Sequence, residues 1–203
     1  MSGSSMFRYM RQVCGFLAVV LASAALLTGQ AQATDKVTTY KDENGWKLLV
    51  NGSDYYIKGV VWGYTPRNEN FTYNLWGEPE DFIRKVLDYE FGLMKAAGVN
   101  TIRSFSTIPP KWVTYIYQEH GIRTIINPLM GRYGYTVGGR WVAQTEYSDE
   151  LTRATLKTDM LEIVDKYKDV PGVLMFAFGN ESTYGLEWSA SFEIENLPEG
   201  AQH

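Results

Sequence analysis

The chain has 203 residues, a formal net charge of −4, 45% hydrophobic residues and 14% aromatic residues, a composition typical of a globular domain rather than a disordered or fibrous chain. An acidic chain without a basic cluster argues against nucleic acids and anionic membranes as partners. With one cysteine and two histidines, His120 and His203, it cannot assemble a His/Cys metal cluster. We predict no metal and no other cofactor.

Residues 1–33 have the pattern of a secretory signal peptide. Two arginines precede a short apolar run at 15–27, and an Ala-Gln-Ala sequence follows at 31–33. A membrane anchor is the alternative, but the run is shorter than the ~20 residues that a spanning helix needs. We therefore predict cleavage before Thr34, a secreted or periplasmic protein without membrane attachment after cleavage, and the N-terminal part of one domain over 34–203.

Turn signals and hydrophobic periodicity predict a hairpin followed by alternating helices and strands. The hairpin spans 46–63 around the turn Asn51-Gly52-Ser53-Asp54, and its second arm is expected to continue into an apolar strand at 57–62. The later elements are a helix over 78–97, a strand at 100–105, a helix over 109–119, a strand at 122–130, a helix that ends near 168 with Ser148 as its N-cap, and a strand at 173–178.

This order of elements predicts an α/β fold with a parallel sheet, right-handed crossovers and helices on the outside. Doubly wound sheets and (β/α)8 barrels both fit the periodicity. The spacing adds one constraint, because four strands take about 125 residues between Tyr55 and Glu181, whereas a complete barrel needs about 250 for eight. If the fold is a TIM barrel, the chain holds only its first four or so βα units, preceded by the hairpin.

Polar and aromatic residues follow the predicted strands at the ends where active sites of parallel sheets collect. Trp62 and Tyr64 follow the first strand, Arg103 ends the second, Asn127 ends the third, and Asn180-Glu181 follow the fourth. The alternative is ordinary solvation, since strand ends become exposed and polar residues are common there. For Asn180-Glu181 we favour a functional role, because Gly179 permits an unusual backbone and the preceding Phe-Ala-Phe segment buries the stem.

Three segments resemble a known family. The stretches DYYIKGVVWGY, MKAAGVNTIRSFS and VLMFAFGNES are together similar to the first half of the barrel of clan A retaining glycoside hydrolases, in particular the catalytic domain of glycoside hydrolase family 2 and the fungal 1,3-β-glucanosyltransferases. The likeness covers roughly residues 47–188. It implies a glycosidase fold, a glycan substrate, and catalytic roles for Arg103, Asn180 and Glu181.

The resemblance implies that Glu181 is the general acid/base and that Arg103 supports the catalytic carboxylates. A retaining glycosidase needs one carboxyl group that donates a proton to the leaving oxygen and then activates water. Apolar surroundings would raise the pKa of Glu181, and Asn180 can bind the sugar 2-hydroxyl. In these families the nucleophile ends the seventh strand, which this chain does not reach. The local carboxylates, such as Glu187, are poor replacements because they fall in loops.

Aromatic side chains crowd the same loops and indicate a groove for a glycan. Sugar rings present flat C–H faces that pack on aromatic faces, and we assign Trp62, Tyr64, Tyr184 and Trp188 to substrate binding together with Asn127. The alternative is that several of these aromatic residues are core or loop anchors.

The sequence therefore predicts a secreted glycoside hydrolase or transglycosidase for a β-linked glycan, with β-glucan as the first candidate by resemblance. As a fragment it is expected to be inactive alone. The alternative is a non-catalytic carbohydrate-binding or structural half-barrel. A half-barrel leaves two sheet edges unpaired, so self-association of two copies is a possible partner interaction.

Overall fold

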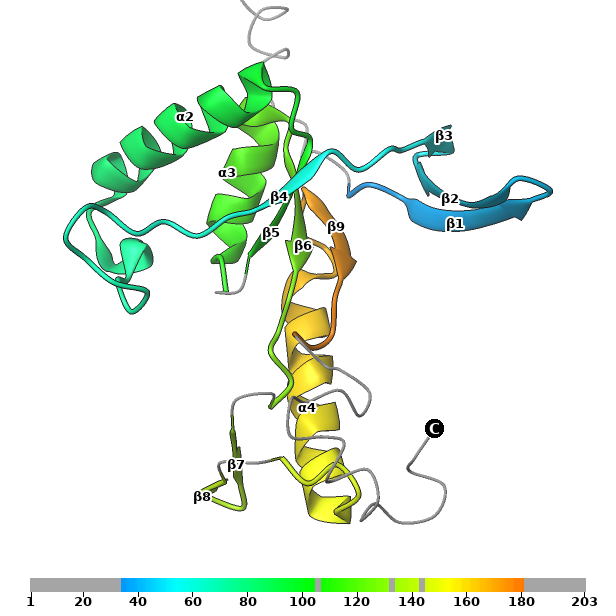
Figure 1. Ribbon diagram of the computed structural model, residues 1–203, viewed down its shortest axis with the longest axis vertical. Helices are drawn as coiled ribbons and strands as arrows, with labels where there is room; N and C mark the ends of the chain where they lie inside the picture. The colour runs from blue at the N-terminus through cyan, green and yellow to red at the C-terminus, as the bar shows by residue number, and fades with distance from the viewer. Residues whose placement is uncertain (1–33, 105–106, 132–133, 143–144, 181–203) are drawn as a thin grey trace, which may run out of the picture. The chain divides into compact units, whose positions relative to one another are not determined.

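The computed structural model describes residues 34–104, 107–131, 134–142 and 145–180. The chain divides into two compact units, residues 1–33 and 34–203, and all described residues lie in the second. Their strands form a three-stranded sheet, a four-stranded sheet and a two-stranded hairpin, and the four-stranded sheet carries the candidate site (Figure 1).

The first sheet is antiparallel and contains the predicted hairpin. Strands β1 (Val37–Asp42), β2 (Gly45–Val50) and β3 (Ser53–Asp54) pair in chain order. Val50 pairs with Ser53 across a two-residue turn, and both turn residues have positive φ, 53° at Asn51 and 81° at Gly52. This is the geometry that an Asn-Gly turn favours, because it follows the right-handed twist of the strands.

The second arm of the hairpin is shorter than predicted. It ends at Asp54 instead of continuing into the apolar strand, which begins separately as β4 (Gly59–Val61) in the second sheet. Strand β1 pairs along its whole length with β2 across a turn at Glu43-Asn44, and Gly45 has a φ of 117°. The sequence prediction did not include β1, although Asn44-Gly45 is a hairpin signal.

The second sheet is parallel, with the order β4-β5-β6-β9. Its other strands are β5 (Thr101–Ser104), β6 (Arg123–Ile126) and β9 (Val173–Phe176). The helices between them are α2 (Glu80–Ala96), α3 (Pro110–His120) and α4 (Glu150–Tyr167), with a 3-10 turn η1 (Leu75–Gly77) before α2 and a hairpin of β7 (Tyr135–Val137) and β8 (Arg140–Val142) before α4. The parallel strands with intervening helices confirm the α/β class.

The strands end earlier than the sequence suggests. The third parallel strand stops at Ile126, not at 130, and the last one stops at Phe176, not at 178. Met130 and Gly131 have φ values of 51° and 76°, which are incompatible with an extended strand. The β7–β8 hairpin then follows, and it was not predicted.

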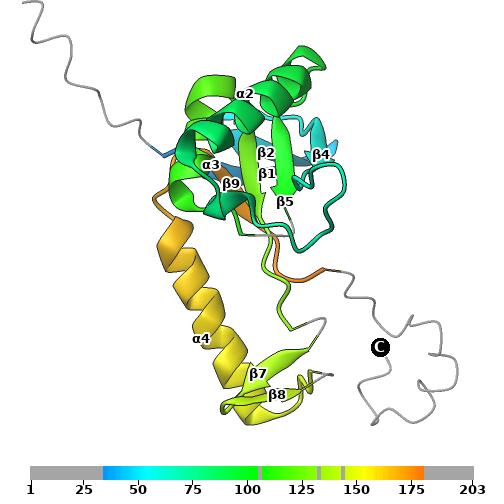
Figure 2. The ribbon, with the colours of Figure 1, turned by 90° about the vertical axis from the view of Figure 1, so that its left-hand side faces the viewer.

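One face of the parallel sheet packs on helices and forms the core. In Figure 1 and Figure 2, α2 and α3 lie against the same face. Ile102 of β5 and Phe91 of α2 are completely buried there, and Trp112 of α3 and Tyr167 of α4 are nearly so. Because successive strand residues alternate between faces, Arg103 lies on the opposite face from Ile102.

The helix ends follow the local signals closely, with one correction. Pro110 occupies the first turn of α3, and Gly121 closes that helix in the left-handed conformation at φ 71°. The N-cap of α4 is Asp149, whose side chain accepts a hydrogen bond from the backbone nitrogen of Thr152 at 2.7 Å. The predicted cap, Ser148, instead bonds Glu146 through its hydroxyl, so the helix starts one residue later than expected.

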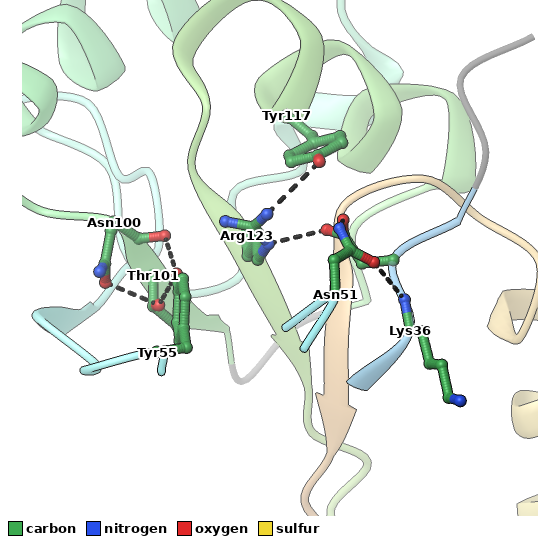
Figure 3. Close-up of polar contacts among 8 residues, drawn as sticks. Lys36, Asn51, Tyr55, Asn100, Thr101, Tyr117 and Arg123 are labelled. Atoms are coloured by element: carbon green, nitrogen blue, oxygen red, sulfur yellow. Dashed lines mark hydrogen bonds and ion pairs between the residues drawn. The ribbon is translucent and has the colours of Figure 1, made fainter. Parts of the chain in front are cut away.

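The three-stranded sheet is connected to the amino-terminal ends of β5 and β6 by two polar clusters, drawn in Figure 3. In the first, the Tyr55 hydroxyl donates to the carbonyl oxygen of Asn100 at 2.9 Å and lies 2.8 Å from Thr101 Oγ1. In the second, Arg123 Nε donates to Asp35 Oδ2 at 2.8 Å. These contacts attach the hairpin to the end of the sheet opposite the candidate site.

Candidate functional site

The candidate site lies where β5, β6 and β9 end. Arg103 on β5 donates through Nε to Asn127 Oδ1 at 2.7 Å and through Nη2 to Asn180 Oδ1 at 2.5 Å. The guanidinium group of Arg103 thus contacts two residues that lie 24 and 77 positions later in the chain. Arginine suits this position because its planar fork presents several donors in fixed directions.

Asn127 follows β6 directly and is only 5% exposed. Its amide nitrogen donates to the carbonyl oxygens of Ala177 at 2.6 Å and Gly179 at 2.7 Å. The side chain therefore joins β6 both to Arg103 on one side and to the segment after β9 on the other. A buried amide that is satisfied on both sides rigidifies the strand ends that it connects.

The segment after β9 turns sharply before it presents Asn180. Gly179 has a φ of 98°, a conformation that residues with a Cβ rarely adopt, and its backbone nitrogen donates to the carbonyl oxygen of Pro128 at 2.9 Å. The sequence prediction of an unusual backbone at this glycine is confirmed. Because an amide carries its oxygen and nitrogen on opposite sides, the bond from Arg103 turns Nδ2 of Asn180 away from the guanidinium.

Of the predicted site residues, the structure brings Arg103, Asn127 and Asn180 together. Glu181, Tyr184 and Trp188 lie outside the described residues. The acid/base and two of the predicted aromatic contacts therefore stay predictions.

Trp62 lies on the other face of the sheet. Its ring is 6% exposed, its Nε1 donates to Glu90 Oε2 at 2.9 Å, and its ring centroid is 5.0 Å from that of Phe91. Its backbone nitrogen bonds the Arg103 carbonyl oxygen and extends the β4–β5 pairing, so strand alternation directs its side chain to the helices. This geometry favours the packing alternative for Trp62.

Tyr64 is partly buried and packs beside the core. Its ring meets Tyr73 edge to face, with centroids 5.9 Å apart. Its substrate contact stays a prediction.

Three groups that contact the predicted site residues were not predicted from the sequence. The carbonyl oxygens of Ala177 and Gly179 are backbone atoms and carry no side-chain signal. Glu90 lies within a helix whose pattern shows only that it is polar. Its pairing with Trp62 Nε1 depends on a helix and a strand meeting 28 positions apart.

A cavity of about 150 Å³ lies beside the site, between β6 and the last turns of α4. Its polar lining includes Ser104, Asn127 and Thr124. The Thr124 hydroxyl is buried and has no hydrogen-bond partner among the described residues. On another wall the Tyr167 hydroxyl donates to the Ile108 carbonyl oxygen at 2.7 Å, and burial raises the pKa of this tyrosine.

The described residues contain no group of three or more His, Cys, Asp or Glu side chains placed to hold a metal ion. No helix in the described ranges has both the length and the apolar character needed to cross a bilayer.

No protein-family model matches the chain, and no curated protein sequence matches it. Among solved structures, the chain is similar to the exo-chitosanase CsxA of Amycolatopsis orientalis, with 21% identity and a TM-score of 0.48 over 73% of this chain. A variant of that enzyme in complex with PNP-β-D-glucosamine gives 20% identity and a TM-score of 0.48 over 72% of this chain. The chain spans only 16% of the length of either structure.

Proposed function

We propose that residues 34–203 are part of an exported glycoside hydrolase or transglycosidase domain that acts on a β-linked glycan with retention of configuration. In this proposal Glu181 is the general acid/base, Asn180 binds the sugar, and Arg103 supports the catalytic carboxylates. The nucleophile is a carboxylate that this chain does not supply, as the resemblance to clan A enzymes implies. β-Glucan is the first substrate to test.

The observation that carries the proposal is the contact of Arg103 with both Asn127 and Asn180 at the ends of three neighbouring parallel strands. Active sites of α/β sheets and barrels lie at this end of the strands. Glu181 follows Asn180 directly in the sequence, so the residue with the proposed proton-transfer role comes next after a side chain held by a buried network.

The strand order supports a barrel rather than a doubly wound sheet. Doubly wound sheets reverse their strand order at a switch point. Here the order β4-β5-β6-β9 follows the chain without reversal, which is the order of successive barrel strands. The helix-covered face then corresponds to the outside of a barrel, and the face with Arg103 corresponds to its inside.

The chemistry follows from these positions. In a retaining enzyme the acid/base donates a proton to the departing glycosidic oxygen while the nucleophile attacks the anomeric carbon, and the same group then removes a proton from water or from an acceptor sugar. Asn180 carries an amide, the kind of group that can hydrogen-bond the sugar 2-hydroxyl. A guanidinium close to two carboxylates would keep the nucleophile ionised by favouring its charged form.

The proposal implies a longer gene product whose further strands complete the barrel, and it is tested in that protein. Glu181→Gln should lower turnover of unactivated β-glycans by about 10²-fold or more, the contribution typical of general acid catalysis. Turnover of an aryl glycoside with a good leaving group should fall less in its first step, because that group departs without a proton. Glu119→Gln, the same substitution at an exposed position in the last turn of α3, serves as the control. Equal turnover by the parent protein and Glu181→Gln would exclude the acid/base assignment.

A second candidate is a non-catalytic half-barrel that associates with another copy. The exposed edge strand β4 favours it, because Val60 and Val61 expose 40% and 55% of their surface. Sedimentation of the purified chain measures whether two copies associate, which the second candidate requires. A stable dimer that binds oligosaccharides without turnover in the longer gene product would support the second candidate.

A further inference from the structure

We propose that Asn127 is a positioning residue that holds Arg103 and the turn before Asn180 in register, rather than a contact for substrate. The inference rests on the proposed function for its catalytic meaning. The arrangement that carries it is independent of that function, because it consists of hydrogen bonds among described residues.

The polar atoms of Asn127 already make hydrogen bonds within the protein. Its two amide hydrogens are directed to the carbonyl oxygens of Ala177 and Gly179, at 2.6 and 2.7 Å, and its Oδ1 accepts from Arg103. A sugar hydroxyl would have to replace one of these short bonds or reach the second lone pair of Oδ1, within a residue that is only 5% exposed. Replacing a buried bond leaves a protein group unpaired, so direct substrate contact is disfavoured.

The neighbours of Asn127 fix the orientation of its side-chain amide. A guanidinium can only donate and a carbonyl oxygen can only accept. Oδ1 of Asn127 must therefore face Arg103, and Nδ2 must face Ala177 and Gly179. No residue other than asparagine or glutamine offers one acceptor and two donors in this way, and glutamine is one methylene longer. Aspartate keeps the acceptor but loses both donors.

The bonds of Asn127 also affect how Arg103 meets Asn180. Arg103 uses Nε for Asn127 and Nη2 for Asn180, so the direction of its fork depends on where Asn127 holds it. The same amide fixes the carbonyl oxygens on either side of Phe178, while Gly179 reverses the chain at φ 98°. One side chain thus bonds both Arg103, the donor to Asn180, and the turn that carries Asn180.

Aspartate allows the two halves of this role to be tested separately. Asn127→Asp should keep the bond from Arg103 Nε and place a carboxylate oxygen against the carbonyls of Ala177 and Gly179. Asn127→Ala should lose both halves. Asn100→Ala is the matched control, because Asn100 also makes three bonds, to Lys58, Thr101 and Tyr56, at the amino-terminal end of the sheet.

The measurement is hydrogen exchange by NMR in the full chain, read at Arg103 Nε–H and at the backbone amide of Gly179, which bonds Pro128. In Asn127→Ala the Arg103 signal should exchange about ten- to hundredfold faster, the factor expected from the loss of a charge-assisted hydrogen bond, and the Gly179 amide should also exchange faster. In Asn127→Asp only the Gly179 amide should exchange faster. In Asn100→Ala neither group should exchange faster than the change in the global stability of that variant accounts for. Unchanged Arg103 exchange in Asn127→Ala would refute the proposal.

Kinetics with the longer gene product separate positioning from substrate contact. A positioning residue predicts that Asn127→Ala lowers kcat at nearly constant KM, whereas a substrate contact predicts a raised KM with little change in kcat. If the parent protein turns over no glycan, the proposed function fails, while the exchange data still decide whether Asn127 holds Arg103 and the turn.

Discussion

Asp35 and Arg123 form an ion pair between the first described residues and the start of β6, 88 positions apart in the sequence. Arg123 Nε lies 2.8 Å from Asp35 Oδ2, and the two side chains are only 17% and 4% exposed. The guanidinium also lies between the rings of Tyr55 and Tyr117, at 5.0 and 5.1 Å from their centroids. Asn51 Nδ2 donates to the second oxygen of Asp35 at 2.6 Å. This cluster attaches the three-stranded sheet to the parallel sheet.

We expect Asp35→Asn to destabilise the protein by about 3 kcal/mol, because removing one partner of a buried pair leaves the other charge uncompensated. Urea unfolding at pH 7 measures the change. Asp42→Asn is the control, since its ion pair with Lys47 is more exposed and should be worth about 1 kcal/mol or less. Equal losses in both variants would contradict a structural role for the Asp35–Arg123 pair.

The stabilisation from Asp35 should depend on pH in a defined direction. Burial by itself raises the pKa of this carboxyl group, but the hydrogen bonds from Arg123 and Asn51 outweigh burial and hold the pKa below the ordinary value of an aspartate side chain. A lowered pKa in the folded state gives stability that is complete above the unfolded value and is lost as the pH falls through the folded value. The difference in unfolding free energy between the parent and Asp35→Asn should therefore be constant from about pH 7 to pH 5 and should shrink below about pH 4. A difference that shrinks on raising the pH from 5 to 7 would show that the sign is wrong.

Thr124→Val should stabilise the protein by about 1 kcal/mol. The Thr124 side chain is 1% exposed and its hydroxyl has no partner among the described residues, whereas valine has the same shape without the unsatisfied polar atom. Thermal unfolding measures the effect, and Thr124→Ser, which keeps the hydroxyl and loses the methyl group, should be less stable than the parent. A loss of stability in Thr124→Val would instead show that water in the adjacent cavity bonds the hydroxyl.

Gly172→Ala should be more damaging than Gly98→Ala. Both glycines have positive φ values, 91° and 80°, so both variants should lose about 1–2 kcal/mol from backbone strain. A Cβ at Gly98 would meet nothing within 4 Å, but one at Gly172 would lie 2.9 Å from Cγ of Tyr117 and overlap its Cβ. The additional loss in Gly172→Ala should appear in urea unfolding, and similar losses in the two variants would mean that Tyr117 moves without cost.

The start of α4 offers a test of its cap. Asp149→Ala should cost about 1 kcal/mol, because Thr152 loses the side-chain acceptor of its backbone nitrogen. Ser148→Ala should cost less, since the Ser148 hydroxyl bonds Glu146 and no helix nitrogen. Thermal unfolding compares the two variants. A larger loss of stability in Ser148→Ala than in Asp149→Ala would show that Ser148 is the N-cap, as the sequence predicts.

Local elements were predictable where their signals are local. The Asn51-Gly52 turn and the helices over 78–97 and 109–119 depend on residues within a few turns of each other, and these predictions are confirmed. The cap of α4 was displaced by one residue because Ser148 and Asp149 are both good caps. Strand β1 was missed because its exposed residues show no regular alternation.

The amino-acid sequence by itself determined the order of the parallel strands and of the helices between them, the Asn51-Gly52 turn and the polar residues that follow these strands. These depend on periodicity, capping and turn chemistry, which act over a few residues. Only the tertiary structure decided that Trp62 faces the helices, that Asn127 joins Arg103 to Gly179, and that Asp35 pairs with Arg123. Such pairings depend on strand register and on which face of the sheet each side chain occupies, and these are set by packing between segments that are distant in the chain.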